Sequence, residues 1–241
     1  MGFFDFIEDK QSNWMEVLWE WADKNNISEF EVVDYPQYNM KEEQGLPRDK
    51  QQLLSFRKLI LNSGSFSSIP KEVGMLTNLQ EIGIYTEKLE ELPKEIGNLT
   101  NLTYLSLSDN KLEILPDEIG NLKNLKVLDL SGNNIKNIPD SLENLKNLKE
   151  LDLSGNNIKN IPDSLGNLNN LTDLNLGDMG RNGNYFKNLP LNIINLKNLT
   201  RIMLWSEFPL SLTNEQKKWL SELKSNNCTI GGSGEVKERV F

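Results

Sequence analysis

The chain repeats itself, and this repetition limits its fold more than any other feature of the sequence. Residues 144–166 match residues 121–143 at all but two positions. The apolar residue that opens each unit recurs at intervals of 23 residues, at Phe56, Leu79, Leu102, Leu125, Leu148 and Leu171. The next unit opens 28 residues later, at Leu199, so the sixth unit carries five extra residues. A constant period of this length is typical of a solenoid, in which every unit stacks on its neighbours.

The unit follows the pattern L-x-x-L-x-L-x-x-N-x-I-x-x-I-P, shown in the third unit by Leu102, Leu105, Leu107, Asn110, Leu112, Leu115 and Pro116. Its L-x-L segment alternates with a period of two and predicts a short strand with one buried face. The equivalent strand follows one unit later, which predicts parallel pairing. Each unit would bury about seven apolar side chains, worth roughly 1.5–3 kcal/mol each. No unit can bury this surface alone, so several units are needed.

Two further positions of the unit have a structural interpretation. An asparagine recurs in the middle units, at Asn110, Asn133 and Asn156. A buried asparagine must be hydrogen-bonded, and a column of them can satisfy the turn backbones of adjacent coils. A proline follows the fifth apolar anchor, at Pro70, Pro93, Pro116, Pro139, Pro162 and Pro190. Because proline cannot join a strand ladder, we expect the chain to leave the strand there for the opposite side of the solenoid.

Because these anchors recur in register over several units, the chain resembles the leucine-rich-repeat family in its 23-residue form, over about residues 46–209. The resemblance implies an α/β fold, a leucine-rich-repeat solenoid with a curved parallel β-sheet on its concave face. It also implies a module for protein–protein interaction, because partners in this family usually dock on the concave face. This form of the repeat is frequent in intracellular and bacterial members.

A solenoid exposes its core at each end, so caps are required. Asn13 resembles the first residue of a capping box and predicts a helix over residues 13–24, with Trp14, Leu18, Trp21 and Ala22 on one face. Residues 27–35 predict an edge strand, and residues 36–50 predict a polar loop. Thr213 opens a second capping box and predicts a C-terminal helix.

We therefore expect four regions in the chain. They are an N-terminal helical cap and linker over residues 1–45, leucine-rich repeats over residues 46–210, a C-terminal cap helix over residues 211–230 and a flexible tail over residues 231–241. The glycine-rich start of the tail is typical of a flexible linker.

The register assigns the outward positions of the strands, and with them the candidate binding residues. Aromatic and methionine side chains are expected to face solvent, where such residues often dominate interfaces. A strip of carboxylates would attract a basic partner, and an insertion at residues 177–183 adds a loop on one face. The predicted partner-binding residues are Tyr85, Tyr104, Asp129, Glu150, Asp152, Asp173, Arg181, Met203 and Trp205.

Each of these features also has a structural interpretation. Caps or loops can cover the aromatic side chains, Trp205 above all. Asp at the outward place of Asp129 is common in the family, and the insertion can be a neutral one. Asp109 belongs to the same acidic strip by position.

Composition excludes most other classes of function. The chain has no histidine, so it lacks the commonest general base and the commonest metal ligand. Seven of its nine net negative charges lie in the first 50 residues, and no basic stripe offers a site for nucleic acid or an anionic membrane. No segment approaches the roughly 20 apolar residues of a membrane span. We expect no enzyme activity, no metal and no cofactor.

Two hypotheses remain from different classes. The first is a protein-binding module that recognises a partner on the strand face. The second is a structural scaffold or inhibitor in which residues 231–241 act as a recognition peptide. The lone Cys228 fits a reducing compartment. We expect a monomer in the cytoplasm and find no signal peptide, while a signal-independent export route is left open.

Overall fold

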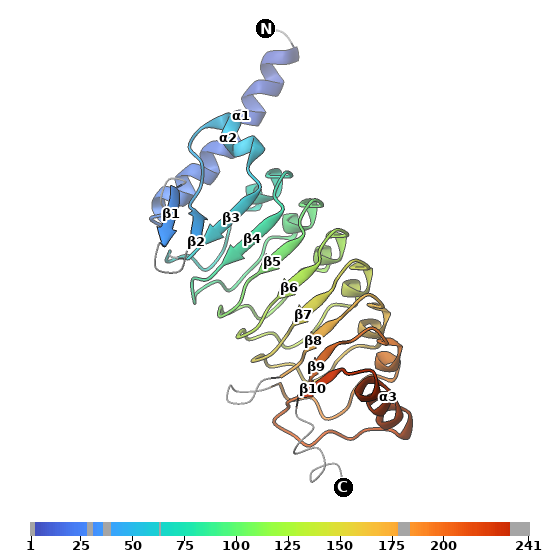
Figure 1. Ribbon diagram of the computed structural model, residues 1–241. Coiled ribbons are helices and arrows are strands. Elements are labelled where there is room, and N and C mark those ends of the chain that lie inside the picture. Colours follow the sequence, from blue (N-terminus) through green and yellow to red (C-terminus); the bar gives the residue numbers. More distant parts are fainter. Residues whose placement is uncertain (1–2, 28–30, 36–39, 63, 178–183, 232–241) are drawn as a thin grey trace.

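A computed structural model describes residues 3–27, 31–35, 40–62, 64–177 and 184–231 of the chain. Within these residues eight parallel strands form one open sheet in the order β10-β9-β8-β7-β6-β5-β4-β3 (Figure 1). The strands are β3 (Lys58–Leu61), β4 (Glu81–Ile84), β5 (Tyr104–Ser106), β6 (Val127–Asp129), β7 (Glu150–Asp152), β8 (Asp173–Asn175), β9 (Arg201–Met203) and β10 (Thr229–Gly231). Parallel pairing in sequence order confirms the predicted solenoid.

The register of the sheet follows the repeat. Leu105 pairs with Leu128, which is one 23-residue unit later. Between β8 and β9, Leu174 pairs with Ile202, so the five extra residues of the sixth unit lie outside the strands and leave the register intact. Side chains that share a place in the unit therefore stand in columns across the sheet.

Short 3₁₀ helices line the side of the solenoid opposite the strands (Figure 1). They are η2 (Lys71–Met75), η3 (Lys94–Asn98), η4 (Asp117–Asn121), η5 (Asp140–Asn144), η6 (Asp163–Asn167) and η7 (Leu191–Asn195). Each begins directly after one of the recurring prolines, for example after Pro116, whose φ is −67°. The fixed φ of proline and its missing N–H suit the start of a helical turn. The predicted exit of the chain at the prolines is confirmed.

The apolar anchors fill the space between the strands and the 3₁₀ helices. In the third unit Leu102, Leu105, Leu107 and Leu112 are fully buried. The core is continuous from the N-terminal helix to the C-terminal helix, because each unit packs on the next.

The buried asparagines join consecutive coils. The Asn133 side-chain amide donates to the Leu107 carbonyl of the preceding coil at 2.9 Å and to the Leu130 carbonyl of its own coil at 3.0 Å. Its side-chain oxygen accepts from the Leu112 N–H at 3.0 Å. In the sixth unit Asn184 takes the same place and donates to the Leu153 and Leu176 carbonyls at 2.8 Å. The asparagine ladder therefore continues past the insertion, as the alignment of Asn184 with Asn133 predicts.

A second asparagine ladder runs along the surface, and the sequence reasoning did not identify it. The Asn124 side chain donates to the Thr100 carbonyl 24 residues earlier, at 2.8 Å. The same bond recurs from Asn78, Asn101, Asn147, Asn170 and Asn198. The recurrence of asparagine before each opening leucine is the signal that could have revealed it.

The N-terminal cap is larger than expected. Helix α1 spans Phe3–Lys24, so Asn13 lies inside the helix and the prediction that Asn13 caps it is wrong. An asparagine in a helix interior costs only about 0.7 kcal/mol relative to alanine, so a capping pattern alone does not start a helix. The expected apolar face is confirmed, because Trp14, Leu18 and Ala22 are buried in the core.

The linker after α1 also differs from the expectation. Strand β1 (Glu31–Tyr35) pairs antiparallel with β2 (Met40–Gln44) in a separate two-stranded sheet. Residues 31–35 are therefore not an edge strand of the solenoid sheet, and residues 36–50 are not wholly a loop. A hairpin pairs the backbone groups of both strands locally. Helix α2 (Lys50–Ser55) follows, with the Asp49 side chain as its N-cap.

The C-terminal cap contains the expected helix and one more strand. Helix α3 (Asn214–Ser225) begins with the predicted capping box at Thr213. Trp219 and Leu223 are buried against the last coil. Strand β10 then adds to β9, so the cap ends in the sheet rather than in a helix. Across the described helices, none is long and apolar enough to cross a membrane.

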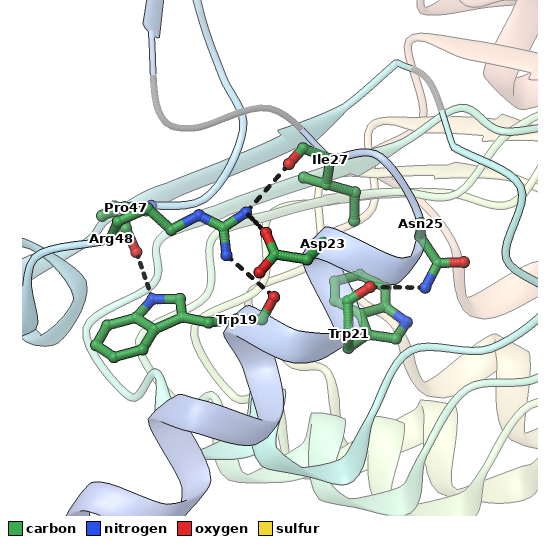
Figure 2. Close-up of polar contacts among 7 residues, drawn as sticks. All are labelled: Trp19, Trp21, Asp23, Asn25, Ile27, Pro47 and Arg48. Carbon is green, nitrogen blue, oxygen red and sulfur yellow. Dashed lines mark hydrogen bonds and ion pairs between the residues drawn. The ribbon is translucent and has the colours of Figure 1, made fainter.

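Arg48 holds the end of α1 to the chain before α2 (Figure 2). Its guanidinium donates to the Trp19 carbonyl at 3.0 Å, to the Ile27 carbonyl at 3.3 Å and to the Asp23 carboxylate at 2.7 Å. The Trp19 indole N–H returns a bond to the Pro47 carbonyl at 2.8 Å. A cation near the C-terminal end of a helix is also favourable to the helix dipole.

Asn133→Ala should lower the free energy of unfolding by roughly 1–3 kcal/mol, because it leaves the buried Leu112 N–H without a partner and the Leu107 carbonyl with only its bond from the Asn110 side chain. Urea denaturation followed by circular dichroism measures the change. Asn134→Ala is the matched control, because the Asn134 contact to Leu112 uses only the backbone. Equal midpoints for the two variants would contradict a role for the ladder in stability.

Arg48→Ala should loosen α1 and lower stability by about 1.5–3 kcal/mol, because charged hydrogen bonds to the Trp19 carbonyl of α1 and to the Ile27 carbonyl after it are lost. Arg48→Lys should recover only part of the loss, since an ammonium lacks the planar fork. Hydrogen exchange of the α1 amides reports the effect, with Arg57→Ala as the control. Exchange in α1 that does not distinguish Arg48→Ala from Arg57→Ala would rule out this anchoring.

Candidate functional site

A shallow hollow of about 200 Å³ lies on the outward face of the sheet, over β5 to β9. Its lining includes five of the nine predicted residues, namely Tyr104, Asp129, Glu150, Asp152 and Asp173. The register explains this grouping. Tyr104, Val127, Glu150, Asp173 and Arg201 form one row across five strands, and Asp129 stands beside Asp152 in the next row.

Asp129 and Asp152 are bound into the fold by similar contacts. One oxygen of Asp129 accepts from the Ser131 N–H at 3.0 Å and from its hydroxyl at 2.7 Å. The equivalent oxygen of Asp152 accepts from the Ser154 N–H at 2.9 Å and from its hydroxyl at 2.6 Å. These two carboxylates therefore shape the turns after β6 and β7 as well as contributing negative charge.

Burial raises the pKa of the Asp152 carboxyl, and the nearby charge of Asp129 raises it further. Hydrogen bonds from Ser154 and Asn175 oppose this shift. The Asn175 amide lies 2.8 Å from the second Asp152 oxygen. The two neighbouring carboxylates thus repel each other in a partly desolvated place, where an added cation would relieve the repulsion.

Asp173 and Glu150 differ in how freely they can bind a partner. Asp173 forms an ion pair with Arg201 on the adjacent strand. Glu150 is exposed, and within the described residues no hydrogen bond or ion pair ties its carboxylate. Arg201 lines the hollow but is not among the predicted residues. Its place beside Asp173 in the row was the signal that could have found it.

The two tyrosines lie on this face, where the register predicts them, and both are half-buried there. The Tyr85 ring lies over Gly83, where a Cβ would come within 2.9 Å of it. Burial raises the pKa of the Tyr104 phenol to about 12, and a hydrogen bond with Tyr85 adds to the shift. The missing side chain at position 83 lets the Tyr85 ring fold down toward the sheet and reach Tyr104.

Met203 and Trp205 are also half-buried, and the hollow does not include them. A Cβ at Gly231 would meet the Met203 sulfur at 1.9 Å, so β10 packs closely against this side chain. A Cβ at Gly177 would meet the Trp205 carbonyl oxygen at 1.7 Å, so the insertion begins where the two backbones touch. Asp109 lies in the turn after β5 and is not part of the hollow either.

Two of the features predicted from the sequence, a binding residue and the tail, lie outside the residues that the structure describes. Arg181 belongs to residues 178–183, and all but the first residue of the 231–241 tail is likewise outside. Among the described residues no group of three or more acidic or cysteine side chains could hold a metal ion. Cys228 is buried, which raises the pKa of its thiol, and the charge of Asp173 raises it further. A raised pKa makes a thiol a weaker nucleophile near neutral pH.

Ultraviolet absorbance should detect Tyr104 ionising near pH 12, because its pKa is raised from 10.0 by burial and by Tyr85. Since the fold favours the neutral phenol, this contribution to stability is present below pH 10 and is lost as the pH rises toward 12. The titration of the wild-type protein minus that of Tyr104→Phe isolates the group. A difference curve centred at pH 10 would show that Tyr104 is solvated.

The sequence of the repeats also matches the profile of a known protein family. A sequence profile described as a leucine-rich repeat region matches residues 94–227, more than half of the chain. No curated protein matches the chain.

Solved structures show the same fold. An internalin from Listeria monocytogenes is 21% identical with a TM-score of 0.58, covering 77% of this chain and 51% of that one. A TDR receptor is 32% identical with a TM-score of 0.54, covering 67% of this chain and 27% of the receptor.

The ectodomain of the plant receptor kinase GASSHO1/SCHENGEN3 from Arabidopsis thaliana is 31% identical with a TM-score of 0.50, covering 67% of this chain and 22% of the ectodomain. The chain thus spans about half of the internalin and about a quarter of the receptors. The profile match, the 23-residue register and the parallel sheet together show that this chain belongs to the leucine-rich-repeat family.

Proposed function

We propose that the outward face of β5 to β9 binds a basic segment of a partner protein. The hollow supports this most directly, because four carboxylates and one tyrosine line a single concave place on the sheet. Concave surfaces lined by a few polar groups beside apolar ones are typical of binding sites. The lining combines charge at Glu150 with the flat, half-buried ring of Tyr104.

The family gives this proposal its general class. Leucine-rich repeats commonly mediate protein–protein interaction and are generally binding modules rather than enzymes. The Arabidopsis ectodomain was solved in complex with CASPARIAN STRIP INTEGRITY FACTOR 2. Because this chain spans only 22% of that ectodomain, only the general mode of binding is carried over and not the partner.

The charges favour an arginine or lysine side chain as the central contact. Glu150 offers an unpaired carboxylate, and a guanidinium from a partner would compete with Arg201 for Asp173. Guanidinium groups also bind carboxylates with two parallel bonds and stack on aromatic rings. Complementary charge of this kind speeds association and makes it sensitive to salt.

Two finer points concern the compartment in which the protein acts and the competing hypothesis for its binding segment. The lone cysteine fits a reducing compartment, and the 23-residue form of the repeat is frequent in bacterial members of the family, so we propose the cytoplasm of a bacterial cell as its place of action. The competing scaffold hypothesis assigns recognition to the tail, and removal of residues 232–241 separates the two. Retained binding supports the strand face.

Peptides selected from a random 12-residue display library on the immobilised protein should carry net positive charge. A selected peptide should bind Glu150→Gln at least tenfold more weakly, because the free carboxylate is lost, and its affinity should fall as salt rises. Fluorescence anisotropy measures both effects. Asp129 and Asp152 are poor test positions because they also hold the serine turns.

Glu95→Gln is the matched control, since it removes the same charge on the 3₁₀ side, in η3. It should leave the affinity unchanged. Neutral or acidic selected peptides, or equal affinities for Glu150→Gln and the wild-type protein, would contradict binding at this face.

A further inference from the structure

A column of charged side chains runs along the edge where each coil passes from its buried asparagine to its proline. It holds one residue per unit, in the order Glu90, Glu113, Lys136, Lys159 and Lys187. The sign changes once, and there the Lys136 ammonium pairs with the Glu113 carboxylate at 2.6 Å. One half of this edge is therefore acidic and the other half is basic.

The acidic half carries an exposed apolar side chain. Ile114 is 76% exposed, the largest value among the large apolar side chains of the described residues. Other units place a polar residue at this position, namely Ser68, Glu91, Asn137, Asn160 and Asn188. Glu90, Glu91 and Glu113 surround Ile114 in the lining of one hollow of about 580 Å³. Lys111 also lines this hollow, so Ile114 is an exposed apolar side chain in a lining of net negative charge, three carboxylates against one ammonium.

The basic half carries a larger groove of about 1030 Å³. Two ammonium groups, of Lys159 and Lys187, and one carboxylate, of Asp163, line it together with the apolar or aromatic side chains of Tyr185, Leu191 and Phe208. Leu191 is 65% exposed and Phe208 is 41% exposed. Other units have a charged residue in the place of Leu191, at Lys71, Lys94, Asp117, Asp140 and Asp163. The groove is thus an apolar departure from the repeat with a net positive lining, two ammonium groups against one carboxylate.

One of the two lysines is positioned by a contact inside the groove. The Lys187 ammonium lies 4.7 Å from the centre of the Phe208 ring, a cation–π contact that holds it at the groove. The Tyr185 and Phe208 rings lie 6.3 Å apart. In the described part of the chain neither Lys159 nor Lys187 forms an ion pair. The groove therefore suits an aliphatic side chain flanked by carboxylates, and Ile114 is one.

We propose that this edge joins two copies of the chain, with Ile114 of each copy seated in the groove of the other. Glu90 and Glu91 of one copy then face Lys159 and Lys187 of the second. Such an interface uses the same surface on both copies, so it closes as a twofold dimer rather than growing into a filament. The edge shares no lining residue with the strand-face hollow, so both surfaces can act independently. This dimer replaces the monomer expected from the sequence.

The dimer can be tested by sedimentation velocity of the full chain. The protein concentration is varied up to about 100 µM, at which dimers held by a weak but specific interface become populated. The wild-type protein should approach twice the 27.6 kDa mass of one chain. Ile114→Asn and Leu191→Asp install residues that other units carry at these places, so both should fold. Each should raise the dissociation constant at least tenfold. Met75→Asn, at an exposed apolar position in η2, is the control and should leave it unchanged.

A mixture of the two variants gives the sharper result. Each variant alone loses both contacts of the twofold dimer. In the mixture, the intact Ile114 of the Leu191→Asp chain can enter the intact groove of the Ile114→Asn chain, so one contact is restored and heterodimers should form. A wild-type protein that stays monomeric throughout, variants that dimerise as well as the wild type, or a mixture no more dimeric than its components would overturn the proposal.

Discussion

The hydrogen bonds between a buried asparagine and the coil before it are the interaction on which the rest of the structure depends. Each turn after a strand would otherwise bury backbone groups without partners, and such groups cost about 1–3 kcal/mol each. The Asn133 side chain satisfies groups of two coils at once, and Asn156 does the same one unit later. Because the coils are held in this register, outward side chains form columns. The strand-face hollow and the charged edge both follow from that order.

The columns of outward side chains also explain why one residue that departs from the repeat pattern can change the charge or polarity of a surface patch. Two almost identical units differ at Val127 and Glu150, and this change supplies the free carboxylate of the hollow. Leu191 in place of a charged residue has a similar effect, because it makes the groove apolar. A regular scaffold thus lets single substitutions decide which patch of the surface can bind.

The repeats could be predicted from sequence because their determinants are local and recur many times. The parallel register, the buried asparagines and the proline exits needed no knowledge of distant contacts. The caps were predicted less well, since the length of α1, the β1–β2 hairpin and the last strand β10 depend on packing that occurs only once. Within the site, the register of the repeats grouped the five predicted residues that line the hollow. It could not show that Tyr85 lies over Gly83, because that orientation depends on a neighbour on the same strand lacking a side chain.

The ladder can be tested most directly by the hydrogen exchange of three backbone amides. The N–H groups of Leu112, Ile135 and Ile158 lie outside every strand, and each donates to the side-chain oxygen of an asparagine in the next coil at 3.0 Å. Native-state exchange followed by nuclear magnetic resonance should find them as strongly protected as the amides of β5 to β8. Exchange at the rate of exposed loop amides would contradict the account.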